Sequence, residues 1–240
     1  MSFPFHEIYC LDDYNNSECP AVFFGMYRFE DYQLMCRHTG DKKIFWTGQD
    51  ALDFDFKNKY HLNNVTAHPN IHTLITSRGF TCELVKPSTF INEVNPQRLG
   101  PKIYAYCPKE AEDYHGKKIL DELAEMGYDI TIGDGSIPQK LWKHSCNGFY
   151  NDIFVGLCLS EFAGGGTSII EMGLRGIPVI TNVFTLPNCQ KWNSTKHIAR
   201  QIDHLKTWIG HTRHDLAKQV WESLDHYHKW LEIENGDTYD

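Results

Sequence analysis

The hydrophobic positions of residues 154–181 follow a pattern that predicts strand, loop, helix and strand in turn. Residues 154–160 form an apolar run without alternation, typical of a strand buried on both faces of a parallel sheet. Three glycines at 164–166 follow, and glycine lets the backbone turn tightly and approach a ligand closely. We expect a helix over 167–176 and a second strand over 177–181. A helix that begins at the carboxyl end of a parallel strand is a common binding site for phosphates in α/β proteins.

The same alternation of strand and helix continues upstream of this segment. We predict a strand over 102–107, a helix over 114–126, a strand over 128–133 and a short helix over 138–147. Strands that alternate with helices in this order build a parallel sheet with helices on both faces. The pattern therefore predicts a doubly wound α/β lobe.

The first hundred residues give a weaker version of the same pattern. We predict strands over 21–25 and 43–46 with a helix near 29–38, and two further strands over 71–76 and 82–86. A carboxylate, Asp50, follows the second strand and its glycine-containing turn, so we expect it at a carboxyl strand end. These elements predict a small first lobe.

Two boundaries complete the expected organisation. Residues 87–101 contain three prolines and a glycine and are typical of a linker, whereas two apolar stripes after residue 191 predict a helical hairpin. We therefore expect a small first lobe at 1–100, a doubly wound second lobe at 101–190 and C-terminal helices at 191–240 that pack across the lobes.

Composition narrows the functional classes. The 240 residues carry 23 Lys and Arg against 31 Asp and Glu, a net charge of −8, without any basic block, which argues against a nucleic-acid partner. No segment reaches the roughly 18 apolar residues of a membrane span. The eight cysteines contain no C-x-x-C pair and fit reduced core thiols. We expect a soluble cytoplasmic protein without a transmembrane segment.

The glycine loop and the segments around it carry a family resemblance. The run 150–160, the three glycines, Glu171 and the segment Gly176-Ile-Pro-Val-Ile-Thr-Asn182 resemble the donor-binding lobe of GT-B glycosyltransferases, especially the retaining, family 4-like branch. The similarity covers roughly residues 101–190 in order. It implies an α/β, GT-B-like fold: two Rossmann-like lobes, the N-terminal one small and the C-terminal one doubly wound, closed by a C-terminal helical hairpin.

The resemblance also implies roles for individual residues. In the family, the glutamate matched by Glu171 holds the ribose of a nucleotide sugar, and the glycine loop meets the diphosphate or the sugar. The family's other signature glutamate falls on Ala163 here, and Glu161 is the nearest carboxylate. The candidate catalytic residues are Asp50, as the base if the anomeric centre is inverted, and Glu161. The candidate donor-binding residues are Gly25, Tyr27, Tyr106, Lys109, Gly164, Gly165, Gly166, Thr167, Ser168 and Glu171.

Plainer interpretations exist for several of these residues. Ser168 and Glu171 have the spacing of a capping box, in which the glutamate only bonds back to its own helix start. Asp50 could simply hold the turn after its strand, Lys109 could be a surface lysine, and Tyr106 could be a core residue. The loop lacks the Gly-Lys-Ser/Thr ending of a P-loop and the last glycine of a dinucleotide fingerprint, which disfavours ATP hydrolysis and dinucleotide binding.

The resemblance implies a glycosyltransferase that moves a hexose from a UDP- or GDP-linked donor to a carbohydrate acceptor hydroxyl. No cofactor or metal is expected, because the histidine pairs at 211/214 and 226/228 do not share a helix face and GT-B enzymes work without one. The alternative is a noncatalytic GT-B relic that holds a nucleotide or a partner. Ala163 at the signature position and the small first lobe favour that alternative.

Overall fold

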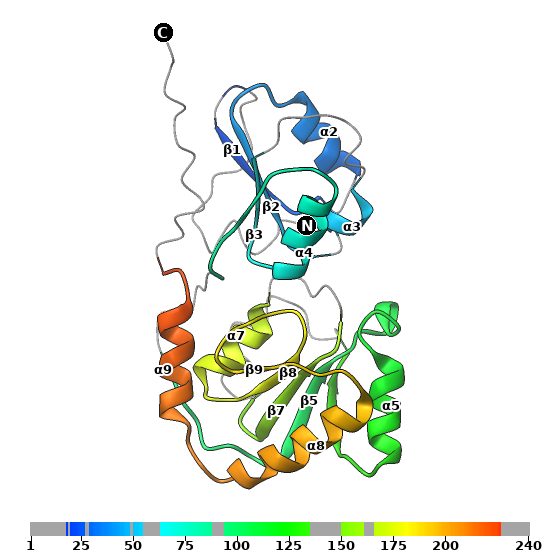
Figure 1. Ribbon diagram of the computed structural model, residues 1–240, viewed down its shortest axis with the longest axis vertical. Coiled ribbons are helices and arrows are strands. Elements are labelled where there is room, and N and C mark those ends of the chain that lie inside the picture. Colours follow the sequence, from blue (N-terminus) through cyan, green and yellow to red (C-terminus); the bar gives the residue numbers. More distant parts are fainter. Residues whose placement is uncertain are drawn as a thin grey trace. The chain divides into compact units, whose positions relative to one another are not determined.

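The computed structural model describes residues 18, 20–26, 29–48, 50–54, 63–87, 94–134, 150–160 and 166–226. Its contacts divide the chain into two compact units. The described residues of the first lie at 18–87, together with Asp225 and His226, and those of the second lie between 94 and 224. Figure 1 shows the first unit in blue to cyan and the second in green to orange.

The first unit is built on a four-stranded parallel sheet whose strands follow one another in sequence order. The strands are β1 (Ala21–Phe24), β2 (Lys42–Trp46), β3 (Asn63–Thr66) and β4 (Cys82–Leu84), and the helices are α2 (Phe29–Arg37), α3 (Asp50–Asp53) and α4 (Pro69–Ser77). Crossovers between parallel strands are right-handed, and here all of them run in one direction. The three helices therefore cover the same face of the sheet.

The core of the first unit lies between that face and its helices. Phe23, Ile44 and Trp46 project from the strands, and Met35, Ile71 and Ile75 meet them from α2 and α4. Trp46 is fully buried, and its indole Nε1 donates to Asn64 Oδ1 on β3 at 2.9 Å. A polar residue in β3 is therefore satisfied inside the core by a neighbouring strand.

One strand predicted from the sequence is wrong. Residues 71–76 belong to helix α4, which begins with Pro69 at its first turn and ends before Gly79, whose φ is 87°. The β-branched residues of this segment suggested a strand, but Ile71 and Ile75 have helical spacing and pack into the core. The third strand is instead the polar segment β3, which hydrophobicity could not reveal.

The second unit is built on a five-stranded parallel sheet with the order β6-β5-β7-β8-β9. Its strands are β5 (Lys102–Tyr106), β6 (Ile130–Gly133), β7 (Ile153–Cys158), β8 (Val179–Thr181) and β9 (Cys189–Gln190). Its helices are α5 (Lys117–Glu125), α7 (Thr167–Leu174), α8 (Thr195–Leu205) and α9 (His214–Ser223), with 3-10 turns η1 (Lys109–Ala111) and η2 (Lys206–Trp208).

Helices cover both faces of this second sheet. The chain leaves β5 toward β6 but leaves β7 toward β8, so right-handed crossovers place α5 and α7 on opposite faces. Helix α8 packs against α5 and β7, whereas α9 packs against α7 (Figure 1). The central strand β7 is buried along nearly its whole length, as its continuous apolar run predicted.

The α/β class with two parallel sheets is thus confirmed. The two helices predicted after residue 191 are present as α8 and α9, but the C-terminal part of the predicted hairpin, after residue 226, lies outside the described residues. The short helix predicted over 138–147 also lies outside them. Residues 95–99 of the predicted linker pair with the second unit, because Asn95 N donates to Leu174 O and Leu99 N donates to His211 O.

Candidate functional site

The second sheet has a topological switch point between β5 and β7. These two strands are parallel neighbours, and the connections that leave their carboxyl ends run in opposite directions along the sheet. In open α/β sheets, ligands bind outside the carboxyl ends of the strands at such a point. The residues that follow Tyr106 on β5 and Cys158 on β7 therefore form the candidate site.

Helix α7 begins at this carboxyl edge and follows the glycine loop. Its N-cap is Gly166, with a left-handed φ of 63°, and Thr167 and Ser168 are the first helical residues. A Cβ at Gly166 would lie 2.2 Å from Cε2 of Phe184, a buried residue after β8. A glycine is thus required at position 166 because the backbone is left-handed there and because a side chain would collide with the Phe184 ring. The predicted site residues Glu161, Gly164 and Gly165 lie outside the described residues.

Glu171 is buried in α7 and has a partner of its own. It is 4% exposed, and its Oε2 accepts a hydrogen bond from Tyr150 Oη at 3.0 Å. The capping-box interpretation is wrong, because the N-cap is Gly166 and Ser168 already lies inside the helix. Glu171 is therefore a buried carboxylate on the inner side of α7, bonded to a residue that precedes β7.

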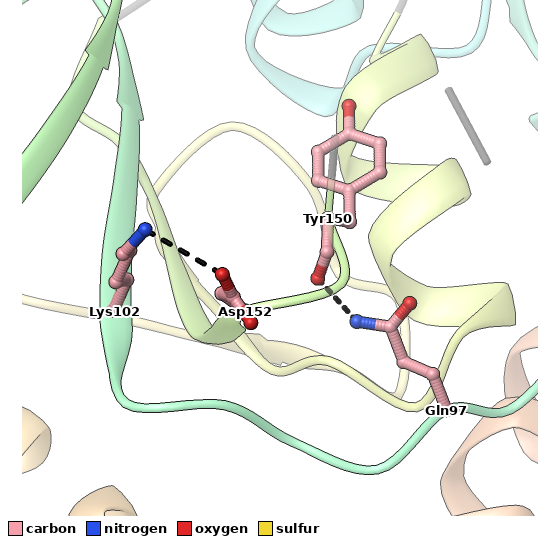
Figure 2. A network of polar contacts seen from close by, with 4 residues as sticks. All are labelled: Gln97, Lys102, Tyr150 and Asp152. Carbon is pink, nitrogen blue, oxygen red and sulfur yellow. Dashed lines mark hydrogen bonds and ion pairs between the residues drawn. The ribbon is translucent and has the colours of Figure 1, made fainter. Parts of the chain in front are cut away.

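Arg175, the C-cap residue that follows α7, lies beside Tyr150 and Glu171. Its guanidinium lies 5.4 Å from the centre of the Tyr150 ring, and its Nη1 donates to the carbonyl of Glu171 at 3.3 Å. The carbonyl of Tyr150 accepts from Gln97 Nε2 (Figure 2). Lys102 Nζ lies 3.5 Å from Asp152 Oδ2 at the amino ends of β5 and β7, which is the edge opposite the candidate site. The sequence analysis missed Arg175 and the bond from Tyr150. The i, i+4 spacing of Glu171 and Arg175 was the available signal.

Tyr106 and Lys109 lie where the sequence placed them, at the carboxyl end of β5. Tyr106 is part-exposed as the last residue of the strand, and Lys109 is exposed at the start of η1. The Tyr106 ring meets the ring of His115 edge to face, with centroids 5.2 Å apart and planes at 90°. Burial, followed by the charge of Glu110, raises the pKa of Tyr106, so the phenol keeps its proton at neutral pH.

The carboxyl edge of the first sheet contains the other predicted residues. Gly25 follows β1 with φ 65°, and its N–H donates to Phe45 O at 2.9 Å, whereas Tyr27 lies outside the described residues. Asp50 is 2% exposed and accepts from the backbone N–H groups of Met26 at 3.3 Å and Gly48 at 2.7 Å. A third donor, Thr47 N, lies 3.3 Å from each carboxylate oxygen.

The hydrogen bonds that Asp50 accepts join the turn after β1 to the turn after β2. Burial raises the pKa of Asp50, and the backbone donors act in the opposite direction. The neighbouring His68, which follows β3, is 1% exposed, and burial lowers its pKa to about 3. The hydrogen bonds of Asp50 are those of a residue that holds a turn, which the sequence analysis had left open.

Two further properties concern the described part of the chain. Within it, no three or more His, Cys, Asp or Glu side chains gather in a way that could hold a metal ion. Its helices are also too short or too polar for any of them to cross a membrane.

Comparison with the models of known protein families and with curated proteins finds no match to this sequence.

Proposed function

We propose that this protein is a GT-B-like glycosyltransferase that moves a sugar from a nucleoside diphosphate sugar to an acceptor hydroxyl. The observation that carries the proposal is the switch point of the second sheet, where a loop with three glycines leads from β7 into α7. The family resemblance of residues 101–190 also supports the proposal.

The proposed chemistry is electrostatic. The free N–H groups at the start of α7 carry partial positive charge, which favours the diphosphate as negative charge develops on its departure. Lys109, exposed after β5, would add a full positive charge at the same edge. Glu171 would hold the ribose by exchanging its bond with Tyr150 for one with a ribose hydroxyl. No step in this proposal requires a metal ion.

A donor panel tests the proposal directly. UDP-, GDP- and ADP-linked hexoses are incubated with the protein, and released nucleoside diphosphate is measured with and without carbohydrate acceptors. We expect release with one base class, and we expect Glu171→Gln to raise the KM for that donor. Glu222→Gln is the matched control, because Glu222 is an exposed helical glutamate whose carboxylate lies 3.8 Å from Lys218.

A noncatalytic nucleotide-binding module is the second candidate. It is favoured by a specific observation, since Asp50, predicted as a base, and Glu171, predicted to bind the ribose, are both buried and bonded inside the protein. Thermal stabilisation by a nucleotide, without nucleoside diphosphate release from any donor, would establish the module and reject the transferase.

A further inference from the structure

Two aromatic rings lie together at the carboxyl end of β5. Tyr106 and His115 meet edge to face, and His115 meets Tyr114 in the same way, with centroids 5.1 Å apart and planes at 82°. Tyr106 and His115 are both part-exposed. Edge-to-face contact fixes the orientation of each ring relative to the other. The pair is therefore an ordered aromatic surface with a right-angled corner, so a flat ligand can stack on one ring and meet the edge of the other.

The position of His115 is set by a close contact between the two loops at the switch point. The next residue, Gly116, has φ 76°, and a Cβ there would lie 2.7 Å from Cβ of Leu159, which follows β7. His115 N also lies within hydrogen-bond distance of the carbonyls of Ala111 and Glu112, at 3.1 and 3.2 Å. The turn that carries His115 is thus held against the start of the loop that leads to α7.

The aromatic surface is uncharged at neutral pH. Burial lowers the pKa of His115, which keeps its imidazole neutral, and the raised pKa of Tyr106 keeps its phenol protonated. A neutral pair has little attraction for a phosphate, but its rings and polar edges suit a flat heterocycle. Phosphates are better placed at the start of α7, after the neighbouring strand β7.

We propose that Tyr106 and His115 form the surface on which the nucleobase of the donor stacks, and that the diphosphate extends from there toward α7. This assignment rests on the proposed nucleotide site at the switch point. It places the nucleobase, rather than the transferred sugar, against Tyr106 and His115. His115 thereby acquires a binding role that its sequence position alone did not indicate.

Equilibrium titrations of UMP, GMP and inorganic pyrophosphate against the full chain test the proposal. We expect His115→Ala to weaken binding of the preferred mononucleotide about tenfold, within the range that loss of stacking on one aromatic ring gives. Pyrophosphate binding should not change. His115→Phe keeps a flat ring and should bind the mononucleotide within about twofold of the wild-type affinity.

The matched control is His204→Ala, which removes a histidine with a similar ring contact, to Trp208 at 6.4 Å, on α8. Wild-type mononucleotide affinity in both His115→Ala and Tyr106→Ala would overturn the stacking role and leave the proposed function standing. An equal loss of pyrophosphate and mononucleotide binding would also overturn it, because His115 would then only support the loop. If the wild-type chain binds no nucleotide, the stacking role and the proposed function fail together.

Discussion

The two parallel sheets differ at the edge where α/β proteins bind ligands. In the first sheet, the described turns after β1 and β2 are buried, and Asp50 joins them through hydrogen bonds from the N–H groups of Met26 and Gly48. In the second sheet, Tyr106, Lys109 and His115 keep part of their surface exposed at the switch point. Sequential strand order gives the first sheet no switch point within its four described strands. This difference supports our proposal that the second edge binds the ligand, whereas the turns of the first edge hold each other.

The largest expected effect separates the two cores. Trp46→Ala removes a fully buried ring from the first sheet and should lower the free energy of unfolding by about 3–5 kcal/mol. Hydrogen exchange should rise in β1–β4 before it rises in β5–β9, because each sheet has its own core.

Phe154→Ala, at a 1% exposed position on β7, is the matched change in the second sheet. In this variant, hydrogen exchange should rise in β5–β9 before it rises in β1–β4. Equal loss of protection in both sheets after either substitution would show that the cores do not unfold separately.

The pH dependence of stability tests the burial of His68 at the carboxyl end of the first sheet. Because the pKa of His68 is lowered to about 3, the folded state favours the neutral ring, and its contribution is complete above pH 6.5. Below pH 6.5 the unfolded chain takes up the proton first, so stability should fall by up to about 1.4 kcal/mol per pH unit.

His68→Gln should remove this slope, which denaturant titrations from pH 7 to pH 4 can measure. His72→Gln, on helix α4, controls for the loss of a histidine. If the free energy of unfolding of His68→Gln kept the same dependence on pH, burial of His68 would not be its source.

A smaller effect on stability is expected from the hydrogen bond between Tyr150 and Glu171. Tyr150→Phe removes a hydroxyl that donates to the buried Glu171 carboxylate over 3.0 Å, so the free energy of unfolding should fall by about 1–3 kcal/mol. If Glu171 also holds a ribose, the same change should lower the donor KM, since the carboxylate no longer has Tyr150 as a competing partner. Loss of stability without any change in KM would limit Glu171 to packing.

The smallest effect belongs to the surface pair Lys102 and Asp152. Their side chains are 48% and 67% exposed and 3.5 Å apart, so Lys102→Ala should change stability by less than about 0.5 kcal/mol. Thermal unfolding measures this change. A loss above about 1 kcal/mol would show that the amino-terminal end of β5 is less exposed to solvent than these values indicate.

The sequence predicted the second unit better than the first for a physical reason. The strands β5 and β7 are continuous apolar runs, and helix α5 places Leu120 and Leu123 on one face, so local pattern and burial agree. In the first unit, α4 is rich in β-branched residues and β3 is polar, and only tertiary contacts such as Trp46 to Asn64 determine their structures.

The site residues follow the same division. Position along a strand was enough to place Tyr106 and Asp50 at carboxyl ends, because strand direction alone fixes which residues lie there. Partners far apart in sequence were beyond reach, and Tyr150 with Glu171 and Gly116 with Leu159 are examples. Such pairs depend on how the strands are ordered, which single-sequence patterns do not encode.

Strand order also has a consequence for how each sheet assembles. In the first sheet every strand pairs with the next one along the chain, as Ala21 does with Lys42. In the second sheet Lys102 on β5 pairs with Ile153 on β7, and the chain that connects these two residues is far longer because it includes strand β6. Closing a longer loop costs more entropy, and folding slows as contact order rises. The switch point that creates the candidate binding edge is therefore also the contact that we expect to form late in folding.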